Sequence, residues 1–586
     1  MIRRILILLA ALALCLSGLS VFADDVFEAG ELHVCRVSME ENETVPVRWY
    51  KDTPSFPFMG IREYYRMLFG EELGFAREGS LVTLTAPDGS TAVWDAEKGT
   101  LASDDLTKFI FPPKLKGEGH GNLASGLPPY LAVKEEKKER EAAPAVLDLA
   151  AYGIPFYTEE DEIWLPVATL SDLFETQKNY MAVWNGKNIY ITDAFRTYQN
   201  GNAKRHDEHY YDMLKSADPR PKDLIDLAYK ELCFNLASFY GYPSATDFSR
   251  VMKEKGLDAA LAEKDPETRK LLLSADRAEY LTGMNRLMTF LLDDGGHTAF
   301  FEHFDATLEE GNAFAEALEA LQGQYDLGDG TRSSLKNAAR KGVKAAREEA
   351  FGDAAYTELG DTAIFMFNTF RLDLDGWENY YNQGGELPVE TDTYAAFHAA
   401  LDKAAANPAI KNFVIDLSLN SGGESFAMSA MVALVCGESD IRFEDTVNGE
   451  RTCVSYLTDT NLDGAIDEKD LEVRYDLNFA VLASGETFSS GNAMASVLSD
   501  KGIPVLGERS GGGSCSVQGN STAEGWSYTI SNNIHLINAA GEDIDAGVPV
   551  VAELVTVSDD GTRDYSAFYD IDRIRECIGS SLSVPQ

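Results

Sequence analysis

A serine lies where a buried strand is predicted to turn sharply into a helix. Residues 479–500 read FAVLASGETFSSGNAMASVLSD, an apolar strand that continues after Ser489 with the apolar spacing of a helix. Such a turn exposes the serine hydroxyl, and the N–H group of Ser490 lies at the helix N-terminus, where partial positive charge can stabilise an oxyanion. This arrangement predicts nucleophilic chemistry at Ser489. The alternative is that Ser489 only caps the helix, because serine is a preferred N-cap residue.

A serine nucleophile requires a base, and the chain contains eight histidines. His297 is the best candidate, because it follows a long apolar helix and lies in the glycine-flanked turn LLDDGGHTAFF. The remaining histidines lie in polar, helical or strand contexts that are typical of structural side chains. They are His33, His120, His206, His209, His303, His398 and His535.

Two adjacent glycines follow another predicted strand. Gly422 and Gly423 belong to the loop LNSGGES, which comes directly after the apolar segment NFVIDL. Because glycine has no Cβ, a backbone built from it can approach a ligand closely. The pair therefore predicts oxyanion donors, and the alternative is an ordinary turn before a helix.

A separate pattern predicts a calcium site between the glycine loop and the serine. Residues 459–470 place oxygen-bearing side chains at positions 1, 3, 5, 9 and 12 of a loop of EF-hand or dockerin type, with glycine at position 6. The backbone carbonyl at position 7 completes the expected set. The candidate ligands are Asp459, Asn461, Asp463, Ala465, Asp467 and Asp470. We expect a structural ion, and the alternative is an Asp/Asn/Gly turn without metal.

The rest of the chain must position these residues. Residues 24–200 alternate short apolar runs with turn residues, which predicts small N-terminal α+β modules, two in number, joined by a charged connector at 114–143. Residues 201–300 predict a helical domain that ends in the His297 turn, and 301–358 a helical insertion. Residues 359–586 alternate strand and helix, so we expect an α/β core with a mostly parallel sheet and a site at its carboxyl strand ends.

Composition and the first residues predict an extracytoplasmic protein. Arg3 and Arg4 precede an apolar run at 5–19 and a small-residue cleavage site, which together indicate a signal peptide over residues 1–23. No later run is long enough for a membrane span. The net charge of −44 argues against nucleic acid or an anionic membrane as a partner. We therefore expect a protein that is secreted or held at a bacterial cell surface.

Three segments, in this order, resemble the C-terminal processing (tail-specific) serine peptidase family. They are NFVIDLSLNSGGES, ASGETFSSGNAMASVLSDKGIPVLGERSGGG and GEDIDAGVPV, within residues 360–555. The resemblance implies that Ser489 is the nucleophile and that Gly422 and Gly423 contribute to the oxyanion hole. It also implies an α/β peptidase core.

The departures from that family point to one of its branches. The loop ERSGGGS carries glycine, at about Gly513, where the Ser-Lys branch has its catalytic lysine. The turn at 294–297 is similar to that of the branch containing the tricorn protease core, in which a histidine is the base. The resemblance then implies that Asp545, in DIDAGVP, orients His297, with Glu542 and Asp543 as alternatives.

These expectations define one leading function and two others. The leading one is a secreted serine endopeptidase that forms an acyl-enzyme, needs no catalytic cofactor and takes protein or peptide substrates. In it, the N–H groups of Gly423 and Ser490 would bind the oxyanion. Because relatives of the tricorn branch include retinoid-binding repeats, a non-catalytic extracellular binding or carrier protein is the first alternative. An adhesion or scaffold protein that acts through its N-terminal modules is the second.

Overall fold

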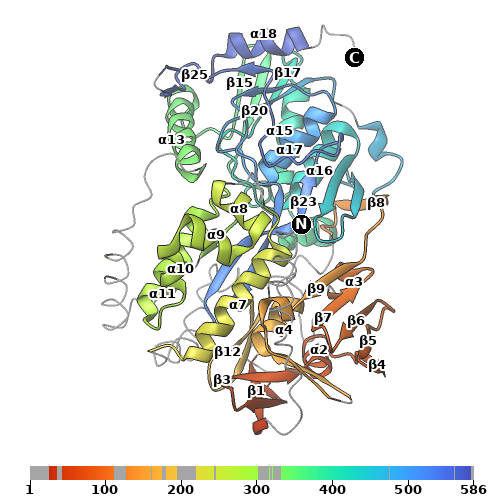
Figure 1. The fold of residues 1–586 in the computed structure, drawn as a ribbon. Coiled ribbons are helices and arrows are strands. Elements are labelled where there is room, and N and C mark those ends of the chain that lie inside the picture. The colour runs from red at the N-terminus through yellow and green to blue at the C-terminus, as the bar shows by residue number, and fades with distance from the viewer. Residues whose placement is uncertain are drawn as a thin grey trace, which may run out of the picture.

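The structure is a computed structural model, shown as a ribbon in Figure 1. It describes residues 26–35, 42–110, 127–159, 161–174, 180–193, 219–242, 246–300, 316, 320, 332–473, 475–559 and 561–581. The predicted signal peptide and most of the first half of the predicted 301–358 insertion lie outside the described residues. Within the described residues, no helix combines the length and the apolar character needed to cross a bilayer.

A six-stranded sheet organises the last part of the chain. Its pairings from β16 to β24 are parallel, and β15 joins β16 in the antiparallel sense. The central strands are buried on both faces, as expected for parallel strands covered by helices. In sheet order the strands are β15 (Tyr356–Leu359), β16 (Thr362–Met366), β17 (Asn412–Asp416), β20 (Asn478–Ala483), β21 (Val505–Gly507) and β24 (Ala552–Glu553).

Helices cover both faces of this core sheet (Figure 1). Successive strand residues point to opposite faces, so Ile364 packs with α13 and α18, whereas Phe365 packs with α15, α16 and α17. One layer therefore contains α13 (Arg332–Phe351) and α18 (Ile571–Ser581). The other contains α14 (Leu374–Gln383), α15 (Thr393–Ala406), α16 (Ser425–Cys436) and α17 (Ser490–Asp500).

The N-terminal region differs from the predicted pair of modules. One seven-stranded sheet draws strands from both halves of the region, in the order β10-β11-β3-β2-β1-β13-β12. Pairing between distant strands is not visible in local sequence patterns. These strands are β1 (Val26–Cys35), β2 (Asn42–Tyr50), β3 (Thr53–Gly60), β10 (Tyr157–Thr158), β11 (Ile163–Pro166), β12 (Tyr180–Trp184) and β13 (Ile189–Asp193), with α2 (Ile61–Phe69) and α4 (Val167–Phe174).

A five-stranded antiparallel sheet of order β4-β5-β6-β7-β9 lies between these two groups of strands in the sequence. Its side chains share one apolar core with the seven-stranded sheet. It consists of β4 (Gly74–Glu78), β5 (Leu81–Thr85), β6 (Thr91–Asp95), β7 (Thr100–Ser103) and β9 (Ala145–Asp148), with α3 (Leu106–Ile110) after β7.

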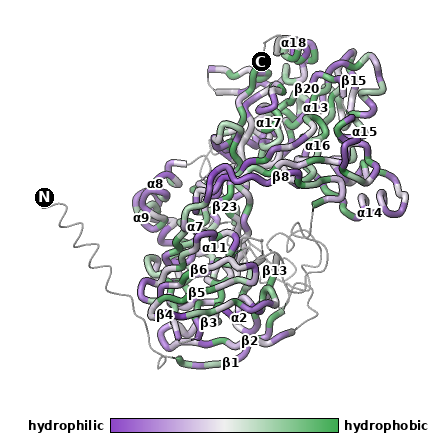
Figure 2. Tube along the Cα trace, turned by 90° about the vertical axis from the view of Figure 1, so that its right-hand side faces the viewer, coloured by the Kyte–Doolittle hydropathy of each residue, from purple (hydrophilic) through white to green (hydrophobic). Residues whose placement is uncertain are grey.

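A second six-stranded sheet joins the N-terminal region to the core. The charged run predicted as a connector forms its edge strand β8, which pairs with β19 and has mostly exposed side chains. In Figure 2 the trace at β8 is coloured as hydrophilic. The run lacks the alternation of apolar and polar residues that indicates a strand, because its side chains are exposed at nearly every position. The sheet comprises β14 (Ala299–Phe300), β23 (Ser527–Ile537), β18 (Ser439–Asp445), β19 (Arg451–Thr458) and β8 (Leu131–Arg140), with β22 (Cys515–Ser521) paired to β23.

A group of helices leads to the predicted histidine turn. After them, a π-helical turn, η5 (Arg286–Leu291), and a short turn bring the chain to His297 and then to β14. Because β14 pairs with β23, this turn is held against the core. The helices are α7 (Lys222–Phe239), α8 (Asp247–Lys255), α9 (Leu257–Lys264), α10 (Pro266–Leu272) and α11 (Arg277–Asn285).

Candidate active site

Ser489 occupies a strained turn between β20 and α17. Its φ of 55° and ψ of −124° are rare for any residue with a side chain. Its hydroxyl caps no N–H group among the described residues, and the side chain is only half-buried. The capping alternative therefore does not describe this serine. Backbone strain of this kind is concentrated at functional sites, where the surrounding structure holds it in place.

Neither glycine of the pair leaves room for a Cβ, and Gly422 lies directly against Ser489. A Cβ on Gly422 would lie 2.7 Å from the Cβ of Ser489, and one on Gly423 would lie 2.4 Å from the carbonyl oxygen of Phe370. Both glycines have positive φ, 110° and 126°. The loop after β17 and the turn after β20 therefore meet at the carboxyl ends of neighbouring parallel strands.

Two N–H groups beside Ser489 are available to an oxyanion. The N–H of Gly422 is already used, because it donates to Oδ1 of Asn420 at 2.8 Å. In contrast, the N–H groups of Gly423 and Ser490 donate to no group in the described part of the chain. The hydroxyl of Ser490 donates to the carbonyl of Gly423 at 2.7 Å and so ties the two donors together.

The His297 turn is built around a buried carboxylate. Asp294 is 2% exposed, and its Oδ1 accepts the N–H groups of Gly296, His297 and Thr298, each at 3.0 Å. Its Oδ2 accepts the Ser531 hydroxyl of β23 at 2.7 Å. Burial raises the pKa of Asp294, but the nearby charge of His297 and then these hydrogen bonds outweigh it and hold the pKa below its ordinary value. The carboxylate therefore fixes the backbone from which the imidazole projects.

The imidazole of His297 packs against the residue that precedes the nucleophile. Its ring centroid lies 4.7 Å from that of Phe488, and the ring planes are inclined by 60°. Burial lowers the pKa of His297, while the charges of Asp294 and Asp545 partly oppose the shift. A neutral imidazole is the form a base requires. No hydrogen bond joins this ring to Ser489 among the described residues; such bonds often form only in the substrate complex.

Asp545 supports the loop behind Ser489 and makes no hydrogen bond to His297. Its buried Oδ1 accepts the N–H groups of Gly513 at 2.9 Å and Ser514 at 3.1 Å, and its Oδ2 pairs with Arg332 at 2.9 Å. The buried Nδ1 of His297 has no partner in the described structure. The expected orienting hydrogen bond is therefore replaced by an ion pair with α13.

The two alternative acids have other partners. Asp543 lies 3.5 Å from Nδ1 of His535, and Glu542 accepts the side-chain amide of Asn538 at 3.1 Å. Of the three acids considered for the imidazole, Asp545 is the one whose charge acts on His297.

Helix α13 brings two cations to the site that sequence reasoning did not identify. Lys336 donates to the carbonyl of Gly295 at 2.8 Å, and its ammonium lies 3.7 Å from the centre of the Phe488 ring. Burial lowers the pKa of Lys336 to about 8. Arg332 and Lys336 are four residues apart on the same helical face, and this spacing was the available signal.

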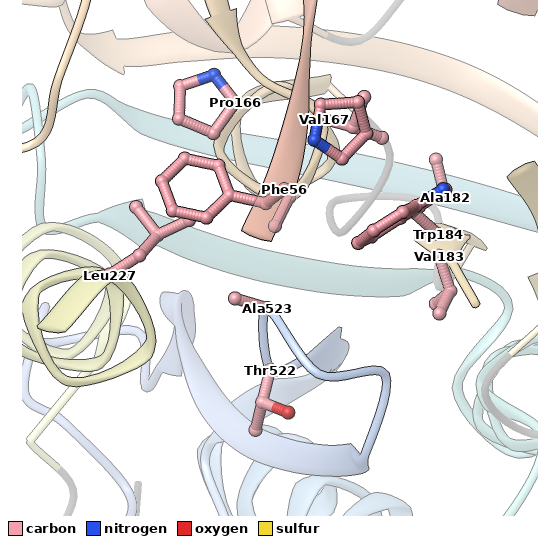
Figure 3. A pocket seen from close by; sticks show the side chains of 11 residues that line it. Phe56, Pro166, Val167, Ala182, Val183, Trp184, Leu227, Thr522 and Ala523 are labelled. Atoms are coloured by element: carbon pink, nitrogen blue, oxygen red, sulfur yellow. The ribbon is translucent and has the colours of Figure 1, made fainter. Parts of the chain in front are cut away.

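A cavity of about 270 Å³ lies between α13 and the loops behind Ser489. Basic and acidic side chains line it together with apolar ones, among them Arg332, Lys336, Arg509, Arg563, Glu508 and Asp545. A second cavity, at the junction of the N-terminal sheet with α7 and the 522–523 turn, measures only about 10 Å³ and is shown in Figure 3. Because that volume is close to one water molecule, this second cavity has no room for part of a substrate. A third cavity, of about 440 Å³, lies in the N-terminal region beside Arg48 and Trp164, away from Ser489.

The predicted calcium loop connects β19 to β20 and contains η7 (Asp470–Glu472). Several of its side chains accept hydrogen bonds within the loop or contact Lys469. Among the described residues, no group of three or more His, Cys, Asp or Glu side chains has the arrangement of a metal site. The calcium site therefore stays a prediction.

Part of this site lies in a segment that matches a known protein family. Residues 373–549 match the model of peptidase family S41, a range that includes Ser489, the glycine pair and Asp545 but not His297. No curated protein matches the chain.

Several solved structures are similar to the chain at low identity. The photosystem II D1 C-terminal processing protease shares 18% identity over 36% of this chain and 48% of its own, with a TM-score of 0.24. This chain thus spans about half the length of that protease. Mature CPAF complexed with lactacystin shares 13% identity over 39% and 54%, with a TM-score of 0.28. A lipoprotein from Streptococcus agalactiae shares 12% identity over 58% and 92%, with a TM-score of 0.28.

The match to the family model covers most of the candidate site. The matched range contains the strained serine turn, the glycine loop that packs against it and the acid behind it. Residues 373–549 of the chain are therefore similar to peptidase family S41.

Proposed function

We propose that this protein is a secreted serine endopeptidase that cleaves protein or peptide substrates through an acyl-enzyme on Ser489. The observation that carries the proposal is the strained backbone of Ser489, whose uncommitted hydroxyl is packed beside Gly422. A strained serine with a free hydroxyl has no evident structural purpose, whereas a nucleophile needs this exposure.

The proposed reaction uses four groups. His297 removes the proton of the Ser489 hydroxyl as the oxygen attacks the scissile carbonyl, and the N–H groups of Gly423 and Ser490 bind the resulting oxyanion. The imidazolium then gives its proton to the leaving amine. Water, activated by the same imidazole, hydrolyses the acyl-enzyme and releases Ser489.

Two carboxylates would stabilise the imidazolium without a hydrogen bond to it. The charges of Asp294 and Asp545 both favour the protonated form of His297, with the larger effect from Asp294. Lys336 and Arg332 oppose them. We infer that Asp545 acts mainly as a positioning residue. Its carboxylate accepts the N–H of Gly513, and the carbonyl of the preceding residue, Gly512, accepts the N–H of Ser489.

Lys336 is the second candidate for the base. Its lowered pKa and its position over Phe488 are the properties expected of a catalytic lysine. However, its ammonium already donates to the Gly295 carbonyl, which holds it on the histidine turn. We therefore assign the proton transfer to His297 and a positioning role to Lys336.

Labelling with a fluorophosphonate tests the proposed function. The purified chain, from residue 24 onward, should react covalently, and peptide mapping should locate the adduct on Ser489. It should also degrade an unfolded protein such as reduced casein. If the folded protein neither reacts nor cleaves, the carrier or scaffold alternatives would replace the peptidase.

The Arg332–Asp545 pair gives a prediction about stability. Asp545 is 1% exposed and its partner 22%, so removing Arg332 leaves a buried carboxylate without its cation. We expect Arg332→Met to lower the free energy of unfolding by about 2–4 kcal/mol. The double variant with Asp545→Asn should recover part of this loss, which urea unfolding of the two singles and the double would measure. Strict additivity of the two losses would contradict the pairing.

A further inference from the structure

The loop between β19 and β20 begins with a buried carboxylate that is only half satisfied. Asp459 is 0% exposed. Its Oδ2 accepts the hydroxyl of Tyr381 at 2.7 Å and the N–H of Gly464 at 2.8 Å. Its Oδ1 is buried and has no hydrogen-bond partner among the described residues. A buried carboxylate oxygen without a donor is costly, so this atom needs a hydrogen-bond donor or a cation.

A second buried carboxylate closes the same loop. Asp470 is 4% exposed, and its Oδ1 accepts the N–H of Thr460 at 2.7 Å, while its Oδ2 accepts the N–H of Asp467 at 2.7 Å. The two ends of the loop are thereby fixed near each other, with two negative charges buried between them. Burial of like charges without a cation opposes folding of this segment.

One cation of the loop itself contacts its outer carboxylates. The ammonium of Lys469 lies 3.3 Å from Oδ2 of Asp463 and 3.7 Å from Oδ2 of Asp467. Its side chain is 66% exposed, so it is held weakly and can leave. It contacts the two outer carboxylates and leaves Oδ1 of Asp459 without a partner.

We propose that residues 459–470 bind one Ca²⁺ ion, with Oδ1 of Asp459 as the buried ligand. Oxygen atoms recur along the loop at the spacing that calcium loops require, and an all-oxygen set of this number suits Ca²⁺ better than the smaller Mg²⁺. The outer carboxylates turn inward when Lys469 leaves. The ligands are the side chains of Asp459, Asn461, Asp463, Asp467 and Asp470 and the carbonyl of Ala465.

The ion would anchor two helices of the core. Tyr381 of α14 donates to Asp459, and the hydroxyl of Tyr394 in α15 donates to the carbonyl of the same residue at 2.7 Å. Trp377 stacks on Tyr381 with ring centroids 5.5 Å apart. Calcium would therefore stabilise the packing of the loop against α14 and α15 and take no part in the chemistry of Ser489.

Binding is measured with Tb³⁺ as a luminescent probe and Ca²⁺ as its competitor. Energy transfer from Tyr381 and Trp377 should make bound Tb³⁺ emit, and Ca²⁺ should displace it. Saturating Ca²⁺ should also raise the melting temperature by at least about 3 °C relative to chelator. Absence of both effects in the folded wild-type protein would overturn the proposal, whatever its peptidase activity.

Three variants locate the ion. Asp463→Asn changes an exposed side chain and should weaken Ca²⁺ binding at least about tenfold, because it removes a charged ligand. Lys469→Met should strengthen it several-fold, since the competing ammonium is gone, a result that a metal-free turn would not give. Asp572→Asn, which removes one negative charge from exposed α18, should leave affinity unchanged. Equal affinity in all three variants would place the ion elsewhere and reject this site.

Discussion

Ser489→Ala should abolish fluorophosphonate labelling and reduce protein hydrolysis by a factor of about 10⁴ or more, while the protein stays folded. The hydroxyl makes no capping bond in the described structure, so its removal withdraws no structural contact. We therefore expect the melting temperature of Ser489→Ala to match that of the wild type. Retained cleavage by the purified variant would contradict the assignment of the nucleophile.

Ser489→Gly is the matched variant that separates strain from chemistry. It should be equally inactive, yet more stable than the wild type by about 1 kcal/mol, because glycine adopts positive φ without steric cost. Such a result would show that the strained turn serves to present the Ser489 hydroxyl and does not stabilise the fold. Urea unfolding of the wild type and the two variants measures this difference. A glycine variant less stable than the alanine variant would show that the turn is not strained.

His297→Ala should lower kcat by at least about 10³-fold with little change in melting temperature, since the imidazole acts in the proton transfer. The wild-type pH profile adds an independent measure. The base is active when neutral, so activity should be constant above the pKa of His297 and fall below it. Because burial lowers that pKa, the acid limb should lie below the ordinary histidine value of about 6.5.

Lys336→Met provides the comparison, because Lys336 is the other candidate base. If it removed the proton, the acid limb would lie near its pKa of about 8. We expect this variant to lose no more than about tenfold in kcat and to keep the wild-type acid limb, as a positioning residue should. An acid limb near 8 that disappears in Lys336→Met would transfer the role of base from His297 to Lys336.

Local features of the site could be predicted from sequence. The strand before Ser489 and the helix after it follow from hydrophobic periodicity over adjacent residues, and the structure has them at Asn478–Ala483 and Ser490–Asp500. The close approach of Gly422 to Ser489 follows from the rule that loops after parallel strands meet at one edge of the sheet. These inferences needed only short-range patterns and one topological rule.

Features that depend on distant partners could not be predicted. Arg332 donates a hydrogen bond to Oδ2 of Asp545, which is 213 residues away in the sequence. Lys336 donates to the carbonyl of Gly295, in the turn that carries His297. Read alone, α13 is rich in Ala and charged residues and resembles an exposed cover, because only a narrow stripe of it is buried at Ala339, Val343 and Arg347. No local pattern in the sequence indicates that Arg332 of this helix pairs with Asp545.

The sheet that contains β8, β19 and β23 limits how the protein can be divided. The strand β19 of the peptidase region pairs along its whole length with β8, and β23 pairs with β14 next to the His297 turn. A fragment that begins at residue 356 would lack both partners and would expose β19 as a bare edge, the kind of strand that recruits other chains into aggregates. The region that matches family S41 is consequently not an excisable module: upstream segments are part of its fold, and expression trials should retain residues from the start of β1.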